Sequence, residues 1–154
     1  MNKINNLLNK AEEYVIFILV LAMTSIIIWQ VFNRFFLRQS LNWSEELARY
    51  LIIWVVFLAG SVGVKRKAHI GVMALVQVFP ENIRYYIIKL SYLVSTIFFI
   101  LIMSYGYKIV LVQKTFHQVS PAMRIPMYIP YLALPIGSLI IALRFFQFFL
   151  KKAE

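Results

Sequence analysis

Long apolar stretches without charge alternate with short polar, basic segments along this chain. The uncharged windows are Tyr14–Asn33, Tyr50–Val64, Leu90–Tyr107 and Ile125–Leu143. A helix needs about 20 largely apolar residues to cross a bilayer, and the second window reaches that length when it is counted from Glu46. With their flanking residues included, the windows predict four transmembrane helices over about 14–36, 45–64, 83–108 and 125–149.

A fifth apolar stretch, His69–Phe79, is too short to span. It follows the basic run Lys65-Arg66-Lys67 and is stopped by Pro80. At 1.5 Å per residue it would form roughly 16 Å of helix. We expect a short helix over 69–79 in the membrane interface, with Lys65, Arg66, Lys67 and His69 at the headgroups. A re-entrant hairpin is the structural alternative. The predicted fold is an all-α integral membrane protein, with four transmembrane helices and this interfacial helix in one membrane domain over 1–154.

Composition supports a membrane protein. Of the 154 residues, 62% are hydrophobic and 14% are charged, which is more apolar surface than a soluble domain of this size can bury. The first window is preceded by Lys3 and Lys10, as in a signal peptide. Its length of roughly 20 residues exceeds a 7–15-residue signal core, and no small-residue cleavage site follows, so we expect a retained helix.

The basic residues predict an orientation. The net charge is +10, but the basic residues flank apolar runs, which favours contact with anionic lipid rather than with nucleic acid. With the N-terminus inside, one side holds nine basic residues: Lys3, Lys10, Lys65, Arg66, Lys67, Arg84, Lys89, Lys151 and Lys152. The other side holds five: Arg34, Arg38, Lys108, Lys114 and Arg124. The positive-inside rule therefore predicts both termini in the cytoplasm.

Candidate chemistry is sparse. All six acidic residues are expected at or beyond helix ends, whereas an ion-coupled carrier usually has carboxylates or broken helices near the midplane. His69 and His117 are expected on opposite sides, so they cannot ligate one haem. There are no cysteines and no catalytic or metal-binding motif. We therefore predict no enzyme, no catalytic residue, no metal and no cofactor.

The most informative polar cluster surrounds the start of the second predicted helix. Ser44 can cap that helix, and Glu45 and Glu46 lie in its first turn, within reach of Arg49. One interpretation is a well-capped helix with a local ion pair. The other is a charged outer collar that docks on a partner protein, whose members are Arg34, Trp43, Glu45, Glu46 and Arg49. The residues alone leave both open.

Several motifs, taken in order, resemble the DctQ family, the small membrane subunits of tripartite ATP-independent periplasmic (TRAP) transporters. They are Asn33-Arg34-Phe35, the run from Leu41 to Tyr50, Trp54 with Phe57-Leu58-Ala59-Gly60, Lys65 to Val72, Pro80, the run from Ser120 to Pro126, and Pro135-Ile136-Gly137. Ala59 departs from the family, which often has a second glycine there. The similarity covers nearly the whole chain.

The resemblance implies a multi-pass protein of the bacterial inner membrane that partners a large subunit holding the sodium and substrate sites. A periplasmic binding protein would deliver a carboxylated solute such as sialic acid, a C4-dicarboxylate or a sugar acid. The small subunit would be a non-catalytic scaffold for sodium-driven symport. Two alternatives remain: a small four-helix exporter, which would need an acidic residue inside its first helix, and a haem or quinone membrane anchor subunit.

Overall fold

The computed structural model describes residues 2–39, 41–65 and 80–150, with the side chains of all these except 2–9, 81 and 82. Within these ranges the regular secondary structure is helical, and there is no strand. The helices are α1 (Asn2–Phe36), α2 (Asn42–Lys65), α4 (Glu81–Thr115), the single turn α5 (Tyr128–Tyr131) and α6 (Ala133–Leu150). Four spans are long and apolar enough to cross a membrane: Lys10–Phe36, Asn42–Lys65, Ile83–Thr115 and Tyr128–Leu150. The prediction of an all-α protein with four membrane helices is confirmed.

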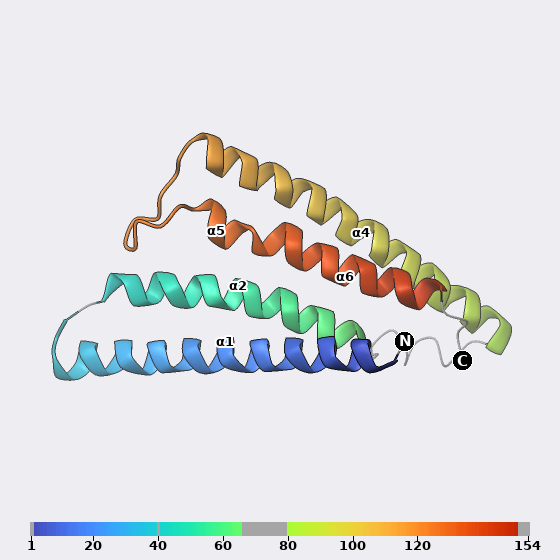
Figure 1. The fold of residues 1–154 in the computed structure, drawn as a ribbon, viewed down its shortest axis with the longest axis horizontal. Helices are drawn as coiled ribbons and strands as arrows, with labels where there is room; N and C mark the ends of the chain where they lie inside the picture. The colour runs from blue at the N-terminus through green and yellow to red at the C-terminus, as the bar shows by residue number, and fades with distance from the viewer. Residues whose placement is uncertain (1, 40, 66–79, 151–154) are drawn as a thin grey trace.

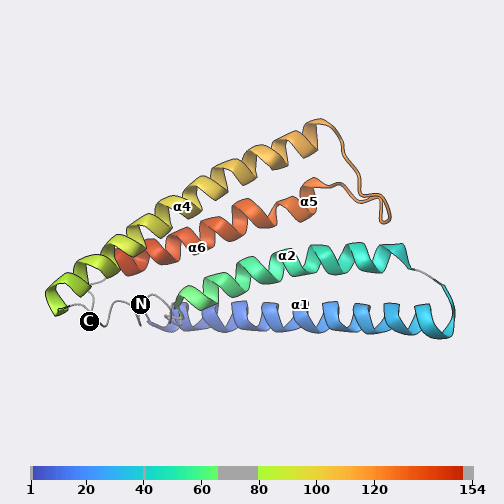
Figure 2. The same cartoon turned by 180° about the vertical axis from the view of Figure 1, so that it is seen from behind.

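The helices form a row rather than a closed bundle. α1 packs on α2, α2 packs on α6, and α6 packs on α4, whereas the backbones of α1 and α6, of α1 and α4, and of α2 and α4 do not approach one another closely. Figures 1 and 2 show this order from both sides, with the α1–α2 and α4–α6 pairs inclined to each other. In the most apolar part of Tyr128–Leu150, 39% of the residues are buried. In the most apolar part of Lys10–Phe36, none is buried. The face of α1 that points away from α2 thus remains available to lipid or to another protein.

The observed helices differ from the predicted ones mainly at their ends. α1 and α4 each have 35 residues, which is about 52 Å of helix and exceeds the roughly 30 Å of a hydrocarbon core. The uncharged windows stop at the first charged residue, so the helical turns at 2–13, before the first window, and at 109–115, beyond Lys108, were missed. The predicted interfacial helix at 69–79 lies outside the described residues.

The fourth membrane span begins later than predicted and is interrupted. Residues 125–127 are not helical, and the helix restarts at Ala133 after the turn α5. Pro135 explains the interruption, because it has no N–H to donate to the Tyr131 carbonyl four residues earlier.

Close packing holds the middle of the row together. A Cβ added to Gly137 of α6 would lie 2.7 Å from Phe57 Cγ of α2, so these two helices approach more closely there than a larger residue would allow. Towards the end of α6, Ile141 and Phe145 are buried with Val64 of α2. Phe99 of α4 stacks on Phe145 with a ring-centroid distance of 5.8 Å. α6 is therefore the helix around which the others are arranged.

Candidate functional site

The start of α2 differs from the predicted capped helix. The helix begins at Asn42, and the fully buried Ser44 donates its hydroxyl to the Leu41 carbonyl at 2.7 Å instead of capping a later turn. Glu45 and Arg49 form the expected ion pair at 3.1 Å, with 67% and 66% of their side chains exposed. This pair is local to the helix and open to solvent.

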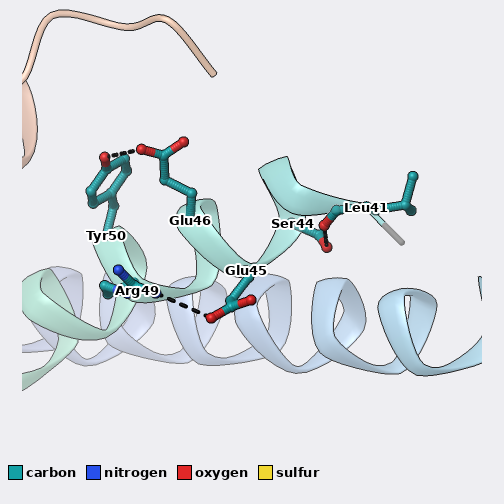
Figure 3. A network of polar contacts seen from close by, with 6 residues as sticks. All are labelled: Leu41, Ser44, Glu45, Glu46, Arg49 and Tyr50. Atoms are coloured by element: carbon teal, nitrogen blue, oxygen red, sulfur yellow. Dashed lines mark hydrogen bonds and ion pairs between the residues drawn. The ribbon is translucent and has the colours of Figure 1, made fainter. Parts of the chain in front are cut away.

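The side chain of Glu46 points away from that of Glu45, as Figure 3 shows. It is only 8% exposed. The Tyr50 hydroxyl donates to its Oε1 at 2.5 Å. Its Oε2 accepts the backbone N–H groups of Ala122 and Met123 at 3.0 and 2.9 Å. Of the two glutamates within reach of Arg49, only Glu45 therefore pairs with it. Glu46 instead binds Tyr50 and the segment that contains Ala122 and Met123.

The segment that supplies these N–H groups is the connection between α4 and α5. It forms a tight hairpin in which Val119 pairs with Pro126 in an isolated antiparallel bridge. Ser120 is nearly fully buried; its N–H donates to the Ile125 carbonyl at 2.8 Å, and its hydroxyl oxygen accepts the Ile125 N–H at 3.3 Å. Arg124 has a φ of 54°, a left-handed conformation that lets the chain reverse. This hairpin leads into α5 and contains the run from Ser120 to Pro126.

A cavity of about 680 Å³ lies between the start of α2 and this hairpin. Its walls combine both arginines and both glutamates of the region with an aromatic ring. The lining residues are Leu41, Asn42, Trp43, Glu45, Glu46, Arg49, Pro121, Ala122 and Arg124. Four of the five predicted collar residues therefore meet at one cavity. Arg34 does not line it, and lies exposed in the last turn of α1.

A second polar cluster, which the sequence did not predict, lies at the opposite end of the helices from the cavity. Arg144 of α6 forms an ion pair with Glu12 of α1, and their side chains are 15% and 16% exposed. The fully buried Ser61 of α2 joins them: its hydroxyl donates to Glu12 at 3.1 Å, and its carbonyl accepts from Arg144 at 3.1 Å. This cluster links three helices.

Both partners of this ion pair could have been noticed in the sequence. Glu12 was assigned to a helix end, whereas α1 continues to Asn2, ten residues further. Arg144 merely closed an apolar window, although an arginine flanked by Leu143 and Phe145 is expensive unless it is paired. Glu12 lies about 36 Å along the helix from Phe36, which places the pair towards one border of a roughly 30 Å hydrocarbon layer and away from its middle.

The residues predicted to contact lipid are described only in part. Lys65 ends α2, while Arg66, Lys67 and His69 lie outside the described residues. His117 is exposed after the end of α4. Because His69 is not described, the prediction that the two histidines lie on opposite sides of the membrane stays a prediction. Among the described residues, no group of three or more His, Asp or Glu side chains could hold a metal ion.

The comparison with known families decides the assignment. The family of the DctQ component of tripartite ATP-independent periplasmic transporters matches residues 23–154, which is most of the chain. The chain belongs to the DctQ family. It is thus a multi-pass membrane protein and a small permease subunit of a TRAP transporter, a class of transporter component rather than of enzyme. Small subunits of this kind work with a large permease subunit.

The chain is similar to several known TRAP transporter proteins, among them the following three. It is 32% identical over 108 residues to the isethionate TRAP transporter permease protein DctMQ of Oleidesulfovibrio alaskensis, covering 68% of this chain and 16% of that protein. It is 26% identical over 168 residues to the C4-dicarboxylate TRAP transporter small permease protein DctQ of Vibrio cholerae, covering 95% and 72%. It is 38% identical over 77 residues to the sialic acid TRAP transporter permease protein SiaT of Haemophilus influenzae, covering 50% and 12%.

Proposed function

We propose that this DctQ-family chain is the non-catalytic scaffold of a sodium-driven TRAP transporter in a bacterial inner membrane. It anchors the large permease subunit, which binds sodium and substrate, and a periplasmic binding protein delivers a carboxylated solute. The names of two relatives give C4-dicarboxylates and sialic acid, which are carboxylates and support this substrate class. The name of the third gives isethionate, a sulfonate, so the chemistry that all three share is that of an organic anion.

The main support for a scaffold is the state of the carboxylates in the described part of the chain. Glu12 is neutralised by Arg144, and Glu46 is occupied by an amide pair and a phenol. Neither is left open to coordinate a sodium ion, and neither lies near the middle of its helix. The open row of helices also leaves α1 with the apolar surface that a membrane partner requires, including the exposed Phe17, Leu21 and Ile28.

The experiment for this function is uptake in proteoliposomes. We expect sodium-dependent uptake only when this chain, the large subunit and the binding protein are combined. The isolated chain should give no sodium signal in isothermal titration calorimetry. Micromolar sodium binding by the purified chain, or uptake by the chain alone, would refute the scaffold role.

The proposed orientation has both termini and the Lys65–Lys67 loop in the cytoplasm, and it places the cavity at the start of α2 on the periplasmic side. Because the chain has no cysteines, Lys65→Cys and Lys114→Cys can each be probed alone with an impermeant thiol reagent in intact cells. We expect labelling at position 114 only. Labelling at position 65 from outside would show that the orientation is the reverse of the one proposed.

On the periplasmic side, the exposed members of the collar are the proposed docking residues: Arg34, Trp43, Glu45 and Arg49. Trp43 is 41% exposed and lines the cavity, so its ring is accessible to a partner. Both partners of the Glu45–Arg49 pair are exposed at the same rim. We place the contact with the binding protein at this rim.

A further inference from the structure

Glu46 differs from the other collar residues in the kind of partner it has. Its hydrogen bonds come from uncharged donors of its own chain, among them the Tyr50 hydroxyl and the N–H groups of Ala122 and Met123. With 8% exposure it presents little charge to an incoming protein. A carboxylate that accepts two consecutive backbone N–H groups holds the conformation of the segment that carries them.

The hairpin needs such an anchor because a cavity separates it from the start of α2. Pro121, Ala122 and Arg124 line one wall of that cavity, and Leu41, Asn42 and Trp43 line the other. The bonds to Glu46 cross between the walls, joining positions 76 and 77 residues apart in the sequence. A further link at the base of the hairpin runs from the Tyr50 hydroxyl to Met127 Sδ at 3.3 Å. Thioether sulfur is a weak acceptor, so the carboxylate is the stronger link.

We infer that Glu46 is a positioning residue that latches the 116–127 hairpin onto α2 and thereby sets the shape of the cavity. It acts through the loop and not by presenting its charge to a partner. The consequence for transport rests on the proposed function, in which the binding protein docks at this rim. The latch itself is a property of this chain and can be measured separately.

Two substitutions separate a latch from a charge that a partner reads. Glu46→Gln removes the charge but keeps a side-chain carbonyl that can accept both N–H groups, while its amide can donate to the Tyr50 oxygen. Glu46→Ala removes every acceptor. A latch predicts that Ala disrupts and that Gln is largely tolerated. A docking charge predicts that both substitutions fail equally. Glu45→Ala is the matched control for the conformation of the hairpin, because it removes the neighbouring carboxylate, whose hydrogen bond goes to Arg49.

The structural measurement is a distance distribution between spin labels in the complex with the large subunit. Gln39→Cys and Val119→Cys are suitable sites, since both residues are exposed and lie on the two sides of the cavity region. We expect a narrow distribution in the parent chain, in Glu45→Ala and in Glu46→Gln, and a broadened or shifted one in Glu46→Ala. An unchanged distribution in Glu46→Ala would overturn the latch and leave the scaffold function intact.

The functional measurement is the concentration of binding protein that gives half-maximal uptake. Loss of two charge-assisted hydrogen bonds should raise it by at least about tenfold in Glu46→Ala, with Glu46→Gln within about twofold of the parent. Co-purification with the large subunit should be unchanged in both. An equal loss in Glu46→Gln and Glu46→Ala would refute the positioning role and show that the negative charge itself is recognised.

Discussion

Among the side chains that the structure describes, two carboxylates are largely shielded from solvent, Glu12 and Glu46. They lie near opposite ends of the helices and are stabilised in different ways. Glu12 meets a formal cation, Arg144, and a buried serine hydroxyl. Glu46 meets two backbone N–H groups and a phenol. The first cluster joins three helices, whereas the second joins one helix to one loop.

This difference decides what each cluster can do. When one partner of a shielded ion pair is removed, the other charge is left unpaired, and that cost falls on the packing of α1, α2 and α6. Removal of the acceptor at Glu46 leaves only neutral N–H groups next to a cavity, which water can reach. The Glu12 cluster should therefore control assembly, and the Glu46 cluster should control local shape.

The largest effect is expected from Glu12→Gln, which leaves Arg144 unpaired among apolar residues. Both side chains of the pair are shielded from solvent, so the remaining charge would be neither paired nor well hydrated. The free energy of unfolding should therefore fall by about 3 kcal/mol or more. The melting temperature of the purified protein in detergent would report the loss.

The double variant Glu12→Gln/Arg144→Gln is the control for that loss. Since no charge is then left unpaired, it should recover most of the stability. Strictly additive losses in the double variant would contradict the assignment of an energetically coupled pair and weaken the contrast with Glu46.

An intermediate effect is expected from Gly137→Ala in the middle of the row, where packing alone joins α2 to α6. The added methyl group would collide with the Phe57 ring, and overpacking of this kind typically costs about 1–3 kcal/mol. Gly63→Ala is the matched control, because a Cβ there meets nothing within 4 Å. Equal melting temperatures for the two variants would indicate that the polar clusters, and not the close approach at Gly137, hold the row.

The smallest stability effect is expected from Glu45→Gln. Its pair with Arg49 is exposed and spaced i,i+4, so the loss should be about 0.3–0.5 kcal/mol, close to the limit of detection. If Glu45 docks on the binding protein, half-maximal uptake will nevertheless require more of that protein. A stability loss as large as that of Glu12→Gln would show that exposure does not separate the two kinds of carboxylate contact.

The sequence by itself determined the class of protein, the four membrane helices and the family. Each of these depends on features local to one segment: lipid must solvate about 20 consecutive residues, and the motifs from Leu41 to Tyr50 and from Ser120 to Pro126 are contiguous. Even the exposed pair of Glu45 with Arg49 is a consequence of helical spacing.

Only the tertiary structure decided which helices touch and what the two carboxylates bind. Periodicity places a residue on a helix but does not say which neighbour that helix meets, so the order α1, α2, α6, α4 could not be read from the chain. Glu12 finds Arg144 132 residues away, and Glu46 finds the N–H of Ala122 76 residues away. Such contacts arise because buried charges and polar groups must be satisfied by whatever the fold brings near them, and that is set by the packing of the whole row.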